Sequence, residues 1–210
     1  MRGVFITLEG ADGCGKSTQA ARLAASIEGL GREVVRLREP GGTSISEKIR
    51  ALVLDPANDQ MTPECELLLF EASRAQLVRE VIEPALCRGA VVVCDRYYDS
   101  TYAYQAAGRS LGEDTIRRAN ALGSCGVDPD RTVVLDMETQ AALARATQEG
   151  ADRMEAEGVA FQARVREGYL RRATEEPDRV RAVDAAGTPD EGAVRVFLQV
   201  KDLLGKDEVA

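Results

Sequence analysis

Five short runs of apolar, largely β-branched residues recur along the chain, and the segments between them carry helical patterns. The runs cover residues 4–8, 34–37, 90–94, 132–135 and 180–183. A continuous apolar run of this length is typical of a strand that is buried on both faces. Alternation of such strands with helices predicts an α/β fold, in which helices cover both faces of a five-stranded parallel sheet.

Local signals locate three of the helices. Thr62-Pro63 has proline at a first helical position, so we expect a long helix to begin there and to run toward Pro84. Thr188 and Glu191 form a capping box at the start of the last helix. In residues 161–173 apolar side chains recur every four residues, which predicts a helix face packed in the core rather than a binding site.

Length and charge narrow the class of protein. With 210 residues the chain is expected to form a single domain over 1–210 with a sizeable core. Its formal net charge of -8 argues against a general affinity for nucleic acid or for an anionic membrane. No apolar stretch is long enough to cross a bilayer, so no membrane-spanning helix is expected. The N-terminal residues run directly into the first predicted strand, so we do not expect a signal peptide.

Cysteine and histidine usage limits the possible chemistry. The five cysteines form no C-x-x-C pair, and their odd number predicts a reduced, cytoplasmic protein. The chain contains no histidine, which excludes Ser-His-Asp and Cys-His hydrolysis and argues against a zinc site. The chemistry must therefore rest on lysine, arginine, carboxylates and a metal ion, and phosphoryl transfer needs only these.

Residues 10–17 read GADGCGKS, the pattern of a phosphate-binding loop. The loop follows a predicted strand and precedes a predicted helix, which is the setting that this motif requires. Its glycines let backbone N–H groups point at phosphate oxygens, and the helix N-terminus adds partial positive charge. We expect Lys16 to reach the β- and γ-phosphates of a nucleoside triphosphate and the Ser17 hydroxyl to bind Mg²⁺. Cys14 is interpreted as a small residue that fits the loop rather than as a reactive thiol.

A charged pair, Asp95 and Arg96, directly follows the third predicted strand. The carboxyl ends of parallel strands face the ligand crevice, so the pair is predicted to lie beside the phosphate loop. There Asp95 would hold the Mg²⁺ shell or accept a proton, and Arg96 would clamp phosphate oxygens. The alternative is an ion pair with a purely structural role, and the neighbouring phosphate loop favours the functional interpretation.

Further candidates stand on helices and in a loop. Phe70 and Arg74 are four residues apart and share a helix face, where the ring could stack on a base and the guanidinium could bind its phosphate. Taken alone, the pair is better interpreted as a core ring with an arginine at the edge of the core. The turn at residues 38–43 contains proline and two glycines and is expected at the same sheet edge. Arg50, in the helix after this turn, points either to the crevice or into solvent. Residues 100–105 offer hydroxyl, ring and amide groups to a base edge, although such clusters more often merely pack.

Together these segments resemble the bacterial thymidylate kinases, which are nucleoside monophosphate kinases. The matching segments span nearly the whole chain and comprise residues 5–18, 38–43, 69–76, 95–97, 100–105 and 152–155. The phosphate loop is shared by many families, whereas Asp-Arg-Tyr followed by Tyr-Gln is specific to this one. The resemblance implies a P-loop NTPase fold and transfer of the γ-phosphoryl of ATP to dTMP, which gives dTDP and ADP for dTTP synthesis. It also implies Mg²⁺ bound with ATP and suggests a homodimer.

The resemblance implies roles for individual residues as well. Phe70 would stack on thymine, and Asp12 would lie near the sugar and the metal. The residues that would bind dTMP are Glu39, Pro40, Arg50, Phe70, Arg74, Arg96, Thr101, Tyr104 and Gln105. The residues that would bind ATP are Gly10, Ala11, Asp12, Gly13, Cys14, Gly15, Lys16, Ser17, Thr18, Arg145 and Ala186. Ser17 and Asp95 would hold Mg²⁺, and the catalytic set would be Asp12, Lys16, Asp95, Arg96 and Arg153.

In this family an arginine that reaches the γ-phosphate comes either from the loop position after the aspartate or from a lid. That loop position is Gly13 here, so the resemblance implies an arginine from the lid. The lid is expected at approximately 147–156, where a polar segment with glycine lies between two helical patterns, and its closure would exclude water. Arg153 is the first candidate for the lid arginine, and Arg145 is the alternative.

Two other functions fit parts of the sequence. A kinase of the same fold that acts on a different monophosphate is the first alternative, because a ring stack and a few hydrogen bonds identify a base poorly from one sequence. The second is a nucleotide switch that transfers nothing to an acceptor. A guanine-specific switch would be expected to contain Asn-Lys-x-Asp, and the sequence lacks it.

Overall fold

The computed structural model describes residues 2–148 and 152–205. Within these ranges the chain forms a parallel sheet in the order β2-β3-β1-β4-β5. The strands are β1 (Phe5–Glu9), β2 (Val34–Arg38), β3 (Val91–Asp95), β4 (Arg131–Asp136) and β5 (Val180–Asp184). The predicted five-stranded parallel sheet is confirmed, and each strand ends one residue later than its apolar run, at a charged residue.

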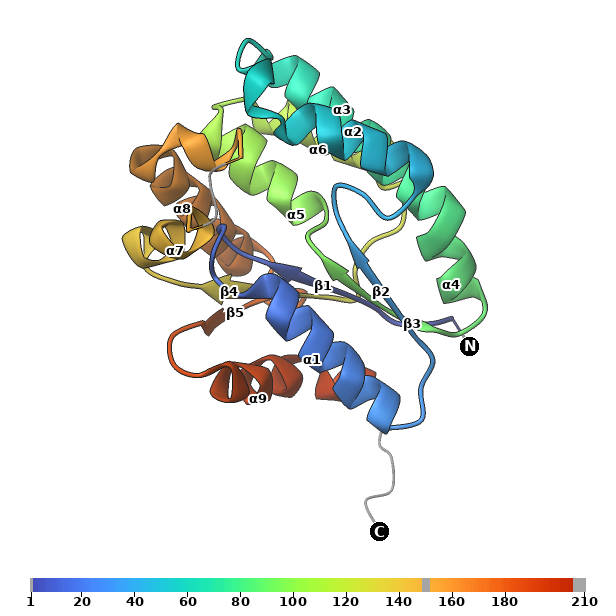
Figure 1. The fold of residues 1–210 in the computed structure, drawn as a ribbon. Helices are drawn as coiled ribbons and strands as arrows, with labels where there is room; N and C mark the ends of the chain where they lie inside the picture. The colour runs from blue at the N-terminus through green and yellow to red at the C-terminus, as the bar shows by residue number, and fades with distance from the viewer. Residues whose placement is uncertain (1, 149–151, 206–210) are drawn as a thin grey trace.

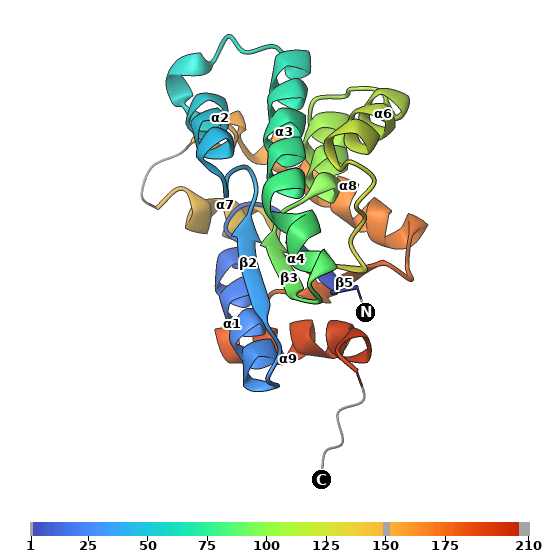
Figure 2. The same cartoon turned by 90° about the vertical axis from the view of Figure 1, so that its right-hand side faces the viewer.

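Helices cover both faces of the sheet, as predicted. The α-helices are α1 (Lys16–Gly29), α2 (Ser44–Leu54), α3 (Pro63–Leu77), α4 (Glu83–Cys87), α5 (Tyr98–Thr101), α6 (Glu113–Gly123), α7 (Thr139–Ala146), α8 (Val159–Glu175) and α9 (Pro189–Val200). The π-helical segments are η2 (Val78–Ile82) and η3 (Tyr102–Gly108), and the 3₁₀ segments are η1 (Pro56–Asn58), η4 (Glu155–Glu157) and η5 (Lys201–Leu203). In Figure 1, α1 and α9 lie on one face of the sheet, and α4, α5 and α8 lie on the other. Figure 2 shows α2, α3 and α6 grouped at one end of the molecule.

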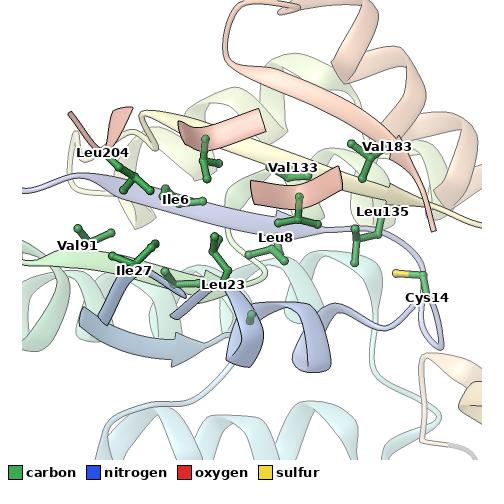
Figure 3. Packing of buried hydrophobic residues seen from close by; sticks show 14 of the residues in the cluster. Ile6, Leu8, Cys14, Leu23, Ile27, Val91, Val133, Leu135, Val183 and Leu204 are labelled. Carbon is green, nitrogen blue, oxygen red and sulfur yellow. The ribbon is translucent and has the colours of Figure 1, made fainter. Parts of the chain in front are cut away.

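The core has a separate layer on each face of the sheet. Ile6 and Leu8 of β1 pack with Leu23 and Ile27 of α1, and Figure 3 shows these side chains pointing toward one another. Phe5 of β1 belongs to the cluster on the opposite face. Side chains alternate between the two faces along a strand, so an apolar strand supplies both layers. The last residue of β1 is a glutamate, which lies on the same face as Phe5.

The long helix that the sequence predicts begins at Pro63, as expected. The Thr62 hydroxyl caps it and accepts a hydrogen bond from the backbone N–H of Cys65 at 3.3 Å. The helical path continues through η2 and α4 past Pro84 as far as Cys87. Proline lacks the N–H that an α-helix needs and crowds the preceding turn. The wider π-helical turn of η2, which ends two residues before Pro84, relieves that conflict.

Two other helix predictions are confirmed. Thr188 and Glu191 form the complete capping box at the start of α9. Phe161, Val165 and Tyr169 of α8 are all buried in one cluster, as the four-residue spacing predicts. Among the described residues, no helix is both long and apolar enough to span a bilayer.

Candidate functional site

The phosphate-binding loop connects β1 to α1 at the carboxyl edge of the sheet. Gly10, Gly13 and Gly15 adopt positive φ angles of 136°, 80° and 95°, which other residues rarely adopt, so the motif's glycines match the backbone conformation. The Lys16 ammonium is buried and donates a hydrogen bond to the Ala11 carbonyl oxygen at 2.8 Å. The loop therefore has the folded shape that phosphate binding requires, with a lysine held at its centre.

Ser17 and Asp95 meet at this edge. The register pairs Leu8 of β1 with Asp95, the last residue of β3. The Ser17 hydroxyl donates a hydrogen bond to the Asp95 carboxylate at 2.5 Å. Among the described residues no group of three or more acidic, cysteine or histidine side chains forms a metal site. A hydroxyl and a single carboxylate fit Mg²⁺ that is bound together with substrate phosphates and water.

Arg96 stands immediately after β3 in a left-handed backbone conformation, with φ at 73°. One terminal nitrogen forms an ion pair with Asp12 at 2.5 Å and donates to the Tyr104 hydroxyl at 3.0 Å. The other donates to Ser100 Oγ at 3.2 Å and to the Tyr169 hydroxyl at 3.0 Å. Although burial opposes ionisation of Asp12, the charge of Arg96 lowers the pKa of that carboxyl to about 2. The Asp12–Arg96 pair is thus fully charged at neutral pH.

A cavity that we call the aromatic cavity lies between α3, η3 and the turn after β2. Its lining residues are Asp12, Glu39, Pro40, Arg50, Leu54, Phe70, Arg74, Arg96, Ser100, Thr101, Tyr104, Gln105, Asp152 and Met154. All nine residues for which a role in dTMP binding is implied line it. Phe70 is half-buried and belongs to none of the core clusters, so the interpretation of Phe70 as a core ring is wrong.

Arg74 is buried rather than at an edge, so that part of the residue-based interpretation is also wrong. Its guanidinium pairs with Glu39 at 2.8 Å and with Glu71 at 2.5 Å, and it donates to Thr101 Oγ1 at 3.1 Å. Burial and the charge of Glu71 raise the pKa of Glu39 to about 8, although Arg74 opposes the shift. These contacts fix the arginine in one orientation at the wall of the cavity.

A second cavity, here called the phosphate-loop cavity, adjoins the first. It is lined by Asp12, Gly13, Gly15, Lys16, Ser17, Thr18, Arg38, Glu39, Arg50, Asp95, Arg96 and Arg145. Four of these residues, Asp12, Glu39, Arg50 and Arg96, line the aromatic cavity as well. Arg50 donates to the Pro40 carbonyl oxygen at 3.0 Å, so of its two predicted orientations the structure has the one toward the crevice.

A third cavity, which we call the α9 cavity, lies between the phosphate loop and the start of α9. Its lining includes Cys14, Arg145, Ala185 and Gly187. Cys14 is buried, which raises the pKa of its thiol and fits the interpretation of a small packing residue. Ala186 is not part of the lining, and its carbonyl oxygen accepts a hydrogen bond from Arg195 at 2.6 Å. The predicted contact between Ala186 and ATP is therefore not supported by this cavity, whose wall contains the neighbouring residues Ala185 and Gly187 instead.

The structure does not place Arg153 in either of the first two cavities. This side chain is only 5% exposed, pairs with Glu66 at 2.6 Å and donates to the Val53 carbonyl oxygen at 2.8 Å. The prediction that Arg153 reaches the transferred phosphoryl is wrong for this conformation, because a buried carboxylate on α3 holds the guanidinium. Arg145, the alternative, is exposed and lines both the phosphate-loop and the α9 cavities.

The predicted lid at approximately 147–156 falls partly outside the described residues, which omit 149–151. Of its described part, Asp152 and Met154 line the aromatic cavity. Asp152 accepts hydrogen bonds from the backbone N–H groups of Met154 and Glu155 at 2.8 and 2.9 Å. The segment that follows the undescribed residues is therefore capped and in contact with the cavity.

Two residues at the site were not found from the sequence. Glu9 is buried beneath Arg96, and Tyr169, which the spacing predicts as core, also donates its hydroxyl to Glu9 at 2.8 Å. A glutamate that directly precedes the phosphate loop, at the end of an apolar strand, was the available signal.

A five-stranded parallel sheet, a phosphate loop with its lysine and serine, and an adjoining cavity define a P-loop nucleotide-binding protein. The family model described as thymidylate kinase matches residues 8–193. The thymidylate kinase of Trichlorobacter lovleyi is 47% identical over 193 residues, which cover 89% of this chain and 91% of that protein. That of Pseudomonas fluorescens is 50% identical over 187 residues and 89% of each chain. The chain belongs to the thymidylate kinase family.

A solved structure agrees with this assignment. The crystal structure of thymidylate kinase from Ehrlichia chaffeensis has a TM-score of 0.77 and 31% identity, and the match covers 97% of this chain and all of that one. The predictions of a P-loop NTPase fold and of the family are confirmed.

Proposed function

We propose that this protein transfers the γ-phosphoryl group of ATP to dTMP, giving dTDP and ADP for dTTP synthesis. Membership of the thymidylate kinase family supports this reaction. The observation that carries it is the position of the Asp12–Arg96 ion pair, which belongs to the walls of both the aromatic cavity and the phosphate-loop cavity. Two nucleotides bound in adjoining cavities would present their phosphates to one fixed arginine.

The aromatic cavity is proposed to bind dTMP. Phe70 offers a ring face on which thymine can stack, and Arg74 offers a cation beside it. The Gln105 amide nitrogen donates to Glu66 at 2.7 Å, which leaves the Gln105 amide oxygen as an acceptor for the N3–H group of thymine. Thr101 and Tyr104 complete the nucleoside wall. Glu39, Pro40, Arg50 and Arg96 would then surround the sugar and the acceptor phosphate.

The phosphate loop is proposed to bind ATP, with its adenine in the α9 cavity. Lys16 and the loop N–H groups would hold the β- and γ-phosphates, as in other P-loop proteins. Ser17 and Asp95 would hold Mg²⁺, and the bound ion would supply positive charge that neutralises the phosphates. Arg145 would contact either the adenine or the γ-phosphate, because it lines both cavities.

The reaction joins two anions, so positioning and charge neutralisation are the main requirements. An oxygen of the dTMP phosphate attacks the γ-phosphorus of ATP, and the bond from that phosphorus to the bridging oxygen of ADP breaks. Arg96 and Lys16 would hold the reacting phosphates in line and offset their repulsion. Arg96 stays charged under all working conditions, because Asp12 raises its pKa well above the ordinary value.

The sequence-based predictions of a single domain over 1–210, a homodimer and a cytoplasmic location are retained as parts of this proposal. Leu68 on α3 is 64% exposed and Leu122 on the adjoining α6 is 78% exposed, which supports an association surface on these helices. All five cysteines are free, which fits a reducing compartment.

An activity panel tests the proposal. The purified protein is assayed with ATP and Mg²⁺ against dTMP, dUMP, UMP, CMP, AMP and GMP, and the fastest turnover is expected with dTMP. Faster turnover on another monophosphate would make this a kinase of different specificity. ATP hydrolysis that proceeds at the same rate without any acceptor would instead favour a nucleotide switch.

A further inference from the structure

A buried acid lies directly behind the arginine of the site. Glu9 is the last residue of β1 and its side chain is completely inaccessible to solvent. One carboxylate oxygen accepts the backbone N–H groups of Tyr97 at 2.7 Å and Ser100 at 3.2 Å. The other accepts Ser100 Oγ at 2.6 Å and the Tyr169 hydroxyl at 2.8 Å. Glu9 thus gathers four donors from two elements without touching either cavity.

The two hydroxyls between Glu9 and Arg96 connect them. Each hydroxyl has a single proton, and the ionised carboxylate can accept both protons. Ser100 Oγ and the Tyr169 oxygen then keep their lone pairs for the terminal nitrogen of Arg96, which lies 3.2 and 3.0 Å away. The negative charge of Glu9 therefore sets the direction of the hydrogen bonds between the two hydroxyls and the guanidinium. The third acceptor of the same nitrogen, the Gly10 carbonyl oxygen at 3.2 Å, does not depend on Glu9.

Glu9 also supports the backbone at this point. Arg96 has a φ of 73°, which is costly for a residue other than glycine. The next residue, Tyr97, donates its backbone N–H to the Glu9 carboxylate. The backbone N–H of Arg96 itself donates to the Leu8 carbonyl oxygen at 2.9 Å. The Glu9 carboxylate therefore stabilises the backbone turn that carries Arg96. It also binds the two hydroxyl groups that accept hydrogen bonds from the Arg96 guanidinium.

We propose that Glu9 is a positioning residue that, as a carboxylate, orients the Arg96 guanidinium through Ser100 and Tyr169. This inference rests on the proposed function, in which Arg96 binds the acceptor phosphate. Protonated Glu9 would have to donate to one of the two hydroxyls, and that hydroxyl proton would then turn toward its neighbour or toward Arg96. Arg96 would lose one of the acceptors that orient it, while its contacts with Asp12, Tyr104 and the Gly10 carbonyl oxygen remain, so its guanidinium would be held less precisely.

The surroundings of Glu9 make this change possible near neutral pH. Burial, with the charge of Asp99 on α5, raises the pKa of Glu9 to about 7, while Arg96 opposes that rise. Glu39, in the turn after β2, also interacts electrostatically with Glu9, but its own pKa is about 8, so it adds a negative charge only as the pH rises to that value and beyond. From α8 the facing titratable group is the Tyr169 hydroxyl, whose own pKa is raised well above its ordinary value by burial. The ionised form of Glu9 is therefore expected to predominate only above about pH 7.

The test is a double-mutant cycle between Glu9→Gln and Tyr169→Phe, with kcat and KM measured for dTMP and for ATP. Glutamine keeps the shape and can still accept the two backbone N–H groups, but its NH₂ group donates to the hydroxyls and reverses their protons. Each single variant is expected to lower kcat/KM for dTMP at least about tenfold, with little change in KM for ATP. The double variant is expected to lose less than the product of the two single losses, because both act on the same arginine.

Two controls separate positioning from folding. Tyr97→Phe removes another buried tyrosine hydroxyl, whose hydrogen bond among the described residues goes to the Val127 carbonyl oxygen at 2.9 Å and not to Arg96 or Glu9. This variant keeps the backbone N–H of residue 97, so it should change thermal stability and leave the kinetics unaltered. In the pH profile of kcat/KM, the wild type should show an acidic limb near pH 7 that Glu9→Gln lacks. The second ionisation of the substrate phosphate, near pH 6, remains in both profiles.

The outcomes are distinct from those for the proposed function. Wild-type protein inactive on dTMP would overturn the proposed function. Active wild type with unchanged kcat/KM in Glu9→Gln would overturn the role of Glu9. If Glu9→Gln fails to fold, Tyr169→Phe decides, and wild-type kinetics in that variant would overturn the proposal.

Discussion

A Cβ atom on Gly13 would lie 1.9 Å from the carbonyl oxygen of Ala142, so α7 packs directly onto the phosphate loop. No side chain fits between them, which explains in physical terms why this loop position holds no arginine. The same close approach brings Arg145, one turn further along α7, to the wall of the phosphate-loop cavity.

The first prediction follows from this packing. Gly13→Ala is expected to displace α7 from the loop and to raise KM for ATP at least about tenfold, while dTMP binding in the absence of ATP stays near the wild-type value. Gly126→Ala is the matched control, because Gly126 has a similar φ of 78° but nothing within 4 Å of an added Cβ atom. Equal effects of the two variants on ATP binding would contradict the prediction.

The second prediction separates the two arginines that the sequence left as alternatives. Arg145→Ala is expected to lower kcat at least about tenfold with little loss of thermal stability, because an exposed cation at the triphosphate site is removed. Arg153→Ala is expected to lower the free energy of unfolding by about 1–3 kcal/mol, because it deprives buried Glu66 of a charged partner. Steady-state kinetics of both variants measure kcat, and denaturant unfolding of both measures the free energy of unfolding. A normal kcat in Arg145→Ala with a raised KM for ATP would assign that residue to adenine.

The third prediction concerns Phe70. Phe70→Ala is expected to weaken dTMP binding by roughly 1–3 kcal/mol, or about 5- to 150-fold, because a base loses its stacking surface. Titration calorimetry with dTMP measures the effect, and Phe70→Leu, which keeps apolar volume without a ring face, should show most of it. Unchanged affinity in a folded Phe70→Ala protein would remove the ring from the site.

The fourth prediction concerns association. Leu68→Glu or Leu122→Glu is expected to shift a dimer toward monomer in sedimentation experiments, because a charge would have to be buried in the interface. Leu198 on α9 is 48% exposed and lies outside this helix group, so Leu198→Glu is the control. Dimers that persist in both α3 and α6 variants would exclude these helices as the interface.

The fifth prediction uses the pKa of Glu9 to predict how stability depends on pH. Because this pKa rises from 4.5 to about 7 on folding, the folded protein binds the proton more tightly than the unfolded chain. The Glu9 contribution to the free energy of unfolding is therefore full below about pH 4.5 and is lost as the pH rises toward 7. Glu9→Gln should gain stability relative to the wild type between pH 5 and pH 8, as urea unfolding at both values can measure. The same difference at both pH values would contradict the raised pKa.

The pattern of apolar residues was enough to predict the fold class, because local sequence signals determine where strands and helices form. Apolar runs identify strands, the phosphate loop identifies the first strand–helix turn, and Thr188 with Glu191 identifies the start of α9. The strand ends were displaced by one residue, because a buried charge such as Asp95 at the site edge does not look like part of an apolar strand.

The site was only partly predictable from the sequence. Ion pairs between residues far apart in the sequence decide which charged side chains remain available to a ligand. Nothing near Arg153 in the sequence shows that Glu66, on the distant helix α3, holds its guanidinium. The role of Tyr169 was equally hidden, because its partner Glu9 is 160 residues away in the sequence. Spacing identified Tyr169 as core correctly, but it says nothing about where the hydroxyl group points.

One guanidinium and one carboxylate, Arg96 and Asp12, form a wall common to both nucleotide cavities. A phosphate in one cavity that draws Arg96 away from Asp12 changes the electrostatic potential in the other cavity. The two affinities are then coupled, and thermodynamics requires the coupling to be equal in both directions. Whatever factor ATP applies to the dissociation constant of dTMP, dTMP must apply to that of ATP.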